Sequence, residues 1–330
     1  SWVGKGFMAA ALIFASIPEP SSAFSENVQH WAREFPKTDF TKRTVDLAGI
    51  RADGAKRDTI MPIHKPKFER VDKVQGLGDL EPVLSFSLHF EARAYPLRVL
   101  LWHEIVNDTI AEQPIVVTYC PLCNSGVVFE RRVSGKTVVF GNTGRLRHFD
   151  MVMYDRDTES WWQQFTGEAI IGTLSGKRLK ALPSRVESFA RFRERHPSGR
   201  VLVPNDPTAR PYGTTPYVRM DTSKGEGLGL YRLPKGVKPF DRVVVVGKEA
   251  WTLKSLKRKG EIDRKNLTIW WEPGQNSIHD TKWIHFGRDV GNVIARRYNA
   301  SLDKWVDTVY DITFAFAFKA FVPGGTLHRK

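Results

Sequence analysis

The stretch Ala94-Tyr-Pro-Leu-Arg-Val-Leu100 is repeated, with small changes, as Ala250-Trp-Thr-Leu-Lys-Ser-Leu256. In each copy an alanine and an aromatic residue lead into a leucine-basic-x-leucine turn of helix. A strand-like apolar run precedes each copy, at residues 82–88 and 242–247. Self-similarity of this kind is the sequence signature of duplication, so we expect two related structural units.

Two further matches extend the repeat. Val139-Phe140-Gly141 corresponds to His285-Phe286-Gly287, and the spacing from Tyr154 to Trp161 recurs from Tyr298 to Trp305. A Tyr-x6-Trp segment with polar residues at its centre predicts a hairpin whose two aromatic residues lie on neighbouring strands. The predicted fold class is therefore α+β and β-rich: two similar antiparallel-sheet lobes from an internal duplication, with a few short helices.

Two local patterns give more specific predictions. Ser184 and Glu187 have the spacing of a capping box, which predicts a helix that ends before Pro197. In residues 312–321, phenylalanines at 314, 316 and 318 alternate with alanines. A period of two is typical of a strand, so we expect a buried strand there.

The chain divides into five segments at changes of composition. Residues 204–240 are rich in proline, glycine and threonine, which indicates a connector between the two repeats. The predicted order is an export-signal remnant (1–23), an amino-terminal extension (24–80), a first repeat lobe (81–203), the connector (204–240) and a second repeat lobe (241–330).

The first segment has the features of a secretory signal. Lys5 supplies a positive charge and residues 6–17 an apolar run, followed by Pro18-Glu19-Pro20 and by small residues suited to cleavage after Ala23. The apolar run is too short to span a bilayer, which needs about 20 residues. We therefore expect a periplasmic or extracellular protein.

Composition excludes several classes of protein. The chain has 330 residues, 41% of them hydrophobic, and only 2 cysteines, which excludes both a disordered chain and a disulfide-rich miniature scaffold. Its net charge of +14 suits an anionic envelope polymer or a lipid surface as a partner. No nucleic-acid motif, phosphate-binding loop or dinucleotide fingerprint occurs, so we expect no nucleotide cofactor.

The two cysteines form the pattern Cys120-Pro-Leu-Cys123, which only the first repeat contains. Strand-like residues flank the pattern on both sides, which favours a tight turn that presents two sulfur atoms to one metal ion. No second cysteine pair exists, so other side chains must complete the site. The candidates are His103, His148, Met151 and Met153. Thiolate, imidazole and thioether ligands favour copper(I) over zinc.

Three alternatives stay open at this stage. The pair could be a thiol-disulfide oxidoreductase site, although the residues after Cys123 lack the helix that activates such a thiol. His103 and Glu104 could act as acid and base in a hydrolase of envelope material. The pair could also be an inert disulfide in a structural envelope protein. The acidic residues Asp150, Asp155, Asp157 and Glu159 are interpreted as turn residues, since they lack the spacing of a calcium loop.

Several motifs resemble the prokaryotic domain of unknown function family 3179. They are Glu91-Ala-Arg-Ala-Tyr-Pro-Leu, His103-Glu-Ile-Val-Asn-Asp108, Thr118-Tyr-Cys-Pro-Leu-Cys123, Val152-Met-Tyr-Asp-Arg156, Gly167-Glu-Ala-Ile170 and the phenylalanine-rich tail. The resemblance spans roughly residues 60–325. It implies an exported or lipid-anchored protein without an assigned activity. Asn124 stands where the family usually has glycine, and Arg147-His148-Phe149 replaces a small polar stretch.

Overall fold

The two copies of the repeated stretch fold into the same strand-strand-helix unit. The computed structural model describes residues 21–52, 55–228 and 231–330. In each copy two antiparallel strands lead directly into a short helix: β3 (Pro82–Leu88), β4 (Glu91–Pro96) and α2 (Leu97–His103) in the first, and β17 (Arg242–Val246), β18 (Glu249–Thr252) and α4 (Leu253–Lys259) in the second.

Each strand-strand-helix unit is completed by a distant strand-helix-strand segment. The segments are β15 (Arg185–Ser188), α3 (Phe189–Arg195) and β16 (Arg200–Val203) in the first copy, and β23 (Asp311–Phe314), α5 (Ala315–Phe321) and β24 (Thr326–His328) in the second. The strand orders β15-β3-β4-β16 and β23-β17-β18-β24 correspond one to one, with the last strand parallel in both. In the first copy β2 (Lys67–Arg70) extends the sheet beyond β16.

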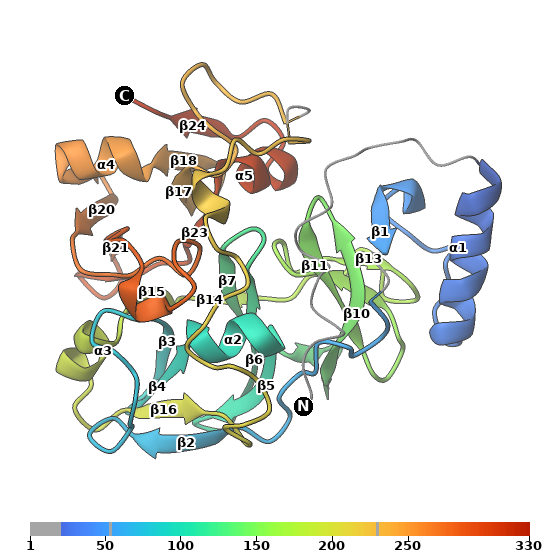
Figure 1. The fold of residues 1–330 in the computed structure, drawn as a ribbon, viewed down its shortest axis with the longest axis horizontal. Helices are drawn as coiled ribbons and strands as arrows, with labels where there is room; N and C mark the ends of the chain where they lie inside the picture. The colour runs from blue at the N-terminus through green and yellow to red at the C-terminus, as the bar shows by residue number, and fades with distance from the viewer. Residues whose placement is uncertain (1–20, 53–54, 229–230) are drawn as a thin grey trace.

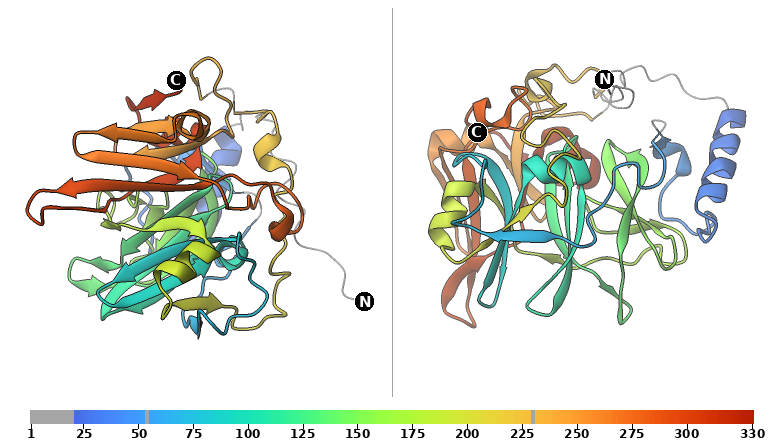
Figure 2. Two further views of the ribbon diagram at one scale, coloured as in Figure 1. Left: turned by 90° about the vertical axis from the view of Figure 1, so that its left-hand side faces the viewer. Right: turned by 60° about the horizontal axis from the view of Figure 1, so that its bottom comes forward.

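A second four-stranded sheet is also common to the copies. Its strands are β5 (Ile105–Ile110), β6 (Gln113–Cys120), β7 (Ser125–Glu130) and β14 (Ala181–Leu182) in the first copy, and β19 (Glu261–Arg264), β20 (Leu267–Glu272), β21 (Asn292–Asn299) and β22 (Lys304–Asp307) in the second. All neighbours in both sheets are antiparallel. The β-rich fold class predicted from the sequence is thus confirmed, and Figure 2 shows the small sheets set side by side.

The first copy carries an insertion between β7 and β14. It contains the ribbon β8 (Arg132–Val133) with β9 (Lys136–Thr137), and the strands β10 (Phe140–Arg147), β11 (Asp150–Asp155), β12 (Trp161–Gln163) and β13 (Ala169–Ile171). β1 (Ile50–Ala52) pairs with β10. Helix α1 (Ser21–Glu34) covers this inserted sheet, where Trp31 packs on Trp161 with ring centroids 5.6 Å apart (Figure 1).

Two of the sequence matches used to extend the repeat are wrong. Phe140 begins β10 of the inserted sheet, whereas Phe286 ends the short 3-10 helix η3 (Ile284–Phe286). Tyr154 and Trp161 are cross-strand partners, as are Tyr298 and Trp305, so both hairpins are confirmed. They belong to sheets that do not correspond, because β11 and β12 lie in the insertion. A hairpin imposes the same local pattern wherever it occurs.

Both specific local predictions need correction. Residues 185–188 form β15 and pair with β3, and the helix starts only at Phe189 with Ser188 as its N-cap. Glu187 lies in that strand and accepts hydrogen bonds from Ser85 and Arg195 instead of capping a helix. In residues 312–321 the strand stops at Phe314 and α5 follows. Phe316 and Phe318 are both buried on this short helix, so their alternation with alanine reflects burial and not a strand.

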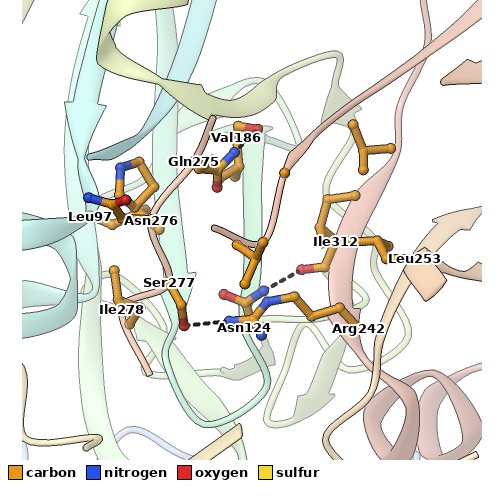
Figure 3. A pocket seen from close by; sticks show the side chains of 14 residues that line it. Leu97, Asn124, Val186, Arg242, Leu253, Gln275, Asn276, Ser277, Ile278 and Ile312 are labelled. Carbon is orange, nitrogen blue, oxygen red and sulfur yellow. Dashed lines mark hydrogen bonds between the residues drawn. The ribbon is translucent and has the colours of Figure 1, made fainter. Parts of the chain in front are cut away.

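The copies meet through reciprocal contacts. The side-chain amide of Asn124 donates to the carbonyl of Ile312, and that of Gln275 donates to the carbonyl of Val186. Ile312 and Val186 occupy equivalent positions in β23 and β15. A cavity of about 20 Å³, room for one water molecule, lies between these contacts (Figure 3). Its lining includes the equivalent residues Leu97 and Leu253, the first residues of α2 and α4. The two copies are therefore arranged with local pseudo-two-fold symmetry.

The predicted export segment lies largely outside the described residues, which begin at Ser21 in α1. Among the helices of the described ranges, none is long and apolar enough to cross a membrane.

Candidate metal centre

The Cys-Pro-Leu-Cys segment forms the tight turn between β6 and β7, as predicted. Cys120 is the last residue of β6 and pairs with Ser125, the first residue of β7. The amide of Asn124 closes the turn on the carbonyl of Pro121 at 3.2 Å. Asn124 has a φ of 52°, a left-handed conformation that asparagine tolerates better than most residues other than glycine. Asparagine at this position is therefore compatible with the turn.

A second tight turn, from the inserted sheet, lies against the first. His148 and Phe149 connect β10 to β11, and both have positive φ, 51° and 62°, as in a type I′ hairpin turn. The carbonyl of Phe149 accepts a hydrogen bond from the thiol of Cys120 at 3.6 Å. Asp150 follows as the first residue of β11. The turn thus brings a carboxylate to the two cysteines.

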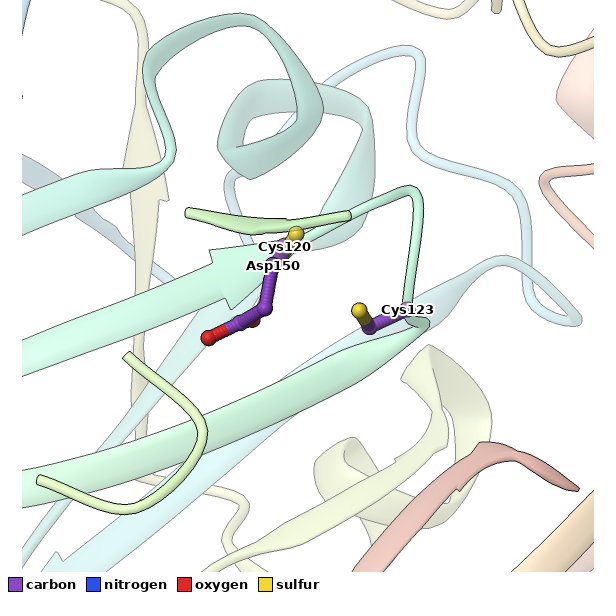
Figure 4. Close-up of side chains that lie close together, drawn as sticks. All are labelled: Cys120, Cys123 and Asp150. Carbon is purple, nitrogen blue, oxygen red and sulfur yellow. The ribbon is translucent and has the colours of Figure 1, made fainter. Parts of the chain in front are cut away.

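Cys120, Cys123 and Asp150 form one compact group (Figure 4). Both sulfur atoms and one carboxylate oxygen lie within 4.8 Å of one another, and all three residues are buried. A tetrahedral zinc ion bound at about 2.3 Å would need its ligand atoms roughly 3.8 Å apart. Small side-chain rotations are therefore enough to bring the three atoms to one ion.

Asp150 is incompletely hydrogen bonded in this group. Its Oδ2 accepts from Gln163 Nε2 at 2.7 Å and from the Phe165 amide at 2.8 Å. Its Oδ1 has no hydrogen-bond partner among the described residues. Burial raises the pKa of Asp150 to about 7, although the bonds from Gln163 and Phe165 oppose that shift. A buried carboxylate oxygen without a partner is costly, and a cation would stabilise it.

Both cysteines are free thiols, and both are fully buried. Burial raises the pKa of Cys120, and it raises the pKa of Cys123 well above its ordinary value. Without a bound cation both thiols are therefore protonated at neutral pH. These are not the low-pKa, accessible thiols of a thiol-disulfide oxidoreductase.

Glu104 is a further buried acid near the group. It follows α2 in a left-handed conformation with a φ of 61°, and its Oε2 accepts from Asn142 Nδ2 at 2.9 Å. Burial raises its pKa to about 8, which keeps it protonated at neutral pH. Once Glu104 ionises at higher pH, its negative charge opposes ionisation of Cys120 and so contributes to the raised pKa of that thiol.

His103 is not a member of the three-residue group. Its Nδ1 bonds the carbonyl of Met61 at 2.8 Å, and its Nε2 bonds the hydroxyl of Tyr212 at 2.7 Å. Both ring nitrogens are therefore already engaged. His103 and Glu104 thus bond to different partners, His103 to Met61 and Tyr212 and Glu104 to Asn142.

His148 and the two methionines lie around the group. His148 Nδ1 bonds the hydroxyl of Tyr231 at 3.0 Å, and burial lowers the pKa of His148 to about 4. Met151 Sδ accepts from Asn142 at 3.4 Å. Met153 is fully buried in the same apolar cluster as both cysteines. Of the predicted ligands, the structure brings Cys120 and Cys123 directly together.

Asp150 is the candidate ligand that the sequence patterns did not indicate. It was interpreted as a turn residue, whereas it is a buried strand residue with an oxygen directed at two thiols. The only local signal is its place after His148-Phe149, a two-residue link between apolar strands. That link predicts a hairpin but does not say which other turn the hairpin will meet.

Comparisons with known proteins identify a family for the chain but add no activity. No curated protein and no solved structure matches the chain. One family does match, over residues 57–325, and its description is protein of unknown function, DUF3179. That match covers most of the chain and includes every residue of the candidate centre. The chain belongs to the DUF3179 family.

Proposed function

We propose that this protein binds one transition-metal ion through Cys120, Cys123 and Asp150. The observation that carries the proposal is the closeness of two buried sulfur atoms to a carboxylate whose Oδ1 lacks a hydrogen-bond partner among the described residues. Metal binding removes protons from its ligands, so an ion would replace the protons that burial now keeps on this group.

The ligand set favours zinc over copper(I), in contrast to the preference inferred from the sequence. Cysteine sulfur and aspartate oxygen are both ordinary zinc ligands, with zinc-oxygen distances of about 2.0–2.2 Å. Copper(I) prefers thiolate and thioether donors, and a carboxylate suits it poorly. Three protein ligands leave a fourth position, which Glu104 or a solvent molecule would take.

Metal titration of the reduced protein tests the proposal. The wild-type chain, stripped with a chelator, should take up one equivalent of Zn²⁺ or of Co²⁺, the latter with sulfur-to-cobalt charge-transfer absorption. The double variant Cys120→Ser/Cys123→Ser should take up none. Wild-type protein that binds neither these ions nor Cu⁺ stoichiometrically would falsify the proposal. Loss of both thiols together on mild oxidation, with no metal uptake, would favour a redox dithiol instead.

We also propose that the protein acts outside the cytoplasm. The support is the signal-like sequence of residues 1–23, together with a net charge of +14 that suits an anionic envelope surface. Cell fractionation followed by mass spectrometry of the amino terminus tests this. The expected product is a periplasmic or extracellular chain that begins at Phe24. Cytoplasmic protein with residues 1–23 intact would contradict it.

A further inference from the structure

The second copy of the repeat holds the cysteine turn through His279. The Nε2 of His279 lies 2.7 Å from the carbonyl oxygen of Pro121, the residue that directly follows Cys120. The imidazole is fully buried, and its ring packs edge-on against Phe314 with centroids 5.0 Å apart. The turn that carries the thiols therefore depends on a side chain more than 150 residues away.

The hydrogen bonds of His279 fix its tautomer. The carbonyl of Pro121 can only accept, so Nε2 carries the hydrogen. The guanidinium of Arg242 can only donate, and its Nη2 lies 3.2 Å from Nδ1, so Nδ1 is the acceptor. Arg242 is itself held by Asp221 at 2.6 Å and by Ser277 at 3.0 Å. The imidazole is thus neutral and is oriented from both sides.

A second contact fixes the other end of the turn. The hydroxyl of Thr313 donates to the carbonyl of Cys123 at 2.6 Å, and the amide of Phe314 donates to the same oxygen at 3.0 Å. The carbonyls of Pro121 and Cys123 are therefore both bonded to the second copy. In the second copy, Glu272 ends β20 and Pro273 follows it, as Cys120 ends β6 and Pro121 follows it in the first. That copy has no thiols of its own at this place.

We propose that His279 and Thr313 are positioning residues of the metal centre. They hold the turn in the one conformation in which both sulfur atoms face Asp150, and they do so through the backbone without touching the ion. This inference rests on the proposed function. It gives the second copy a specific role: it supplies the rigid support for a site whose ligands all come from the first.

Matched substitutions at His279 test this role. His279→Leu removes the donor to Pro121, whereas His279→Gln keeps a nitrogen donor close to the place of Nε2. Loss of a hydrogen bond that orients metal ligands typically weakens metal binding by about 10–100-fold. We expect that loss in Co²⁺ and Zn²⁺ affinity for His279→Leu, and a change of no more than about threefold for His279→Gln. The control is Ile269→Ala, which loses a fully buried side chain of the second copy without touching the turn.

Two readouts separate this inference from the proposed function. Equal affinity in His279→Leu and the wild type, or an equal loss in His279→Leu and Ile269→Ala, would overturn the positioning role. If the wild type binds no metal, the proposed function fails. The rate of thiol alkylation by a maleimide then shows whether His279 holds the cysteine turn in place. Faster alkylation in His279→Leu than in Ile269→Ala supports the role, and equal rates overturn it.

Discussion

The hydroxyl of Thr313 donates a 2.6 Å hydrogen bond to the carbonyl oxygen of Cys123, across 190 residues of sequence. This contact joins β23 of the second copy to the turn between β6 and β7 of the first. Asp150, the third member of the group, comes from the inserted sheet. Three parts of the chain therefore meet at one small group, and the predictions below separate their contributions.

Removal of the Asp150 charge should abolish tight metal binding with little loss of fold. Asp150→Asn keeps the shape of the side chain but replaces the anionic ligand, so we expect at least a hundredfold weaker Zn²⁺ binding in isothermal titration. The control is Asp155→Asn at the other end of β11. Asp155 is equally buried and bonds Trp162 Nε1 at 2.9 Å. Similar affinities in the two variants would exclude Asp150 as a ligand.

Glu104 should make the metal-free protein less stable as the pH rises. Its folded pKa of about 8 lies above its ordinary value of 4.5. Its stabilising contribution is therefore complete below pH 4.5 and is lost as the pH rises through about 8. One such group changes the free energy of unfolding by at most about 1.4 kcal/mol per pH unit.

Urea denaturation between pH 5 and pH 8 measures the effect of Glu104. Asp150 and Asp311, whose pKa values burial also raises to about 7, add to the same trend, so the informative quantity is the difference from Glu104→Gln. That variant can still accept the bond from Asn142 but does not titrate. We expect its unfolding free energy to fall less steeply with pH than that of the wild type. Parallel profiles would show that Glu104 does not titrate in this range.

Two arginines that bind the same carboxylate should differ in importance. Arg242 and Arg288 lie 2.6 Å and 2.7 Å from Asp221 Oδ2, but their side chains are 9% and 40% exposed. Arg242→Ala removes the buried cation of Asp221 and the partner of His279, while Arg288 still pairs with Asp221, so it should cost up to about 3 kcal/mol. Arg288→Ala should cost about 1 kcal/mol or less. Thermal or chemical denaturation measures the stability of both variants. An equal loss of stability would show that burial does not make Arg242 more important than Arg288.

Gly141 should not tolerate a side chain. A Cβ at this position would lie 2.5 Å from the ring of Tyr154 and 2.7 Å from Asp58 Oδ1. Overpacking of this kind typically costs about 1–3 kcal/mol, so Gly141→Ala should lower the unfolding midpoint in urea. Gly49→Ala is the matched control, because a Cβ there meets no atom within 4 Å. If the two variants had the same stability, the prediction would be wrong, because Tyr154 and Asp58 would then move aside at no cost.

The sequence was informative where the decisive pattern was local. The strand-strand-helix units at Ala94 and Ala250 could be predicted because each contains its own apolar run and helix start. The cysteine turn could be predicted for the same reason, since strand-like residues flank it on both sides. Pro121 and Asn124 also supply the turn chemistry that the structure uses.

The rest could not be predicted because it depends on packing between distant segments. Residues 185–188 are a strand only because β3 pairs with them, and that pairing overrides a sequence that resembles a helix start. Asp150 reaches the cysteines from the inserted sheet and His279 from the loop between β20 and β21, and nothing in the sequence near either residue identifies its partner. The insertion also obscured the repeat, because its hairpin has the same aromatic spacing as β21 and β22.

The bond from Thr313 to Cys123 has a consequence for biosynthesis. The turn leaves the ribosome 190 residues before the side chain that will hold it. At about 5–20 residues per second, that interval lasts roughly 10–40 s. During this time the contacts from the second copy that hold the turn and help to bury it do not yet exist, so both thiols are more open to oxidants and to adventitious ions. The proposed metal centre is therefore complete only after the whole polypeptide has been made, and a carrier that shields the nascent thiols would raise the yield of correctly folded protein.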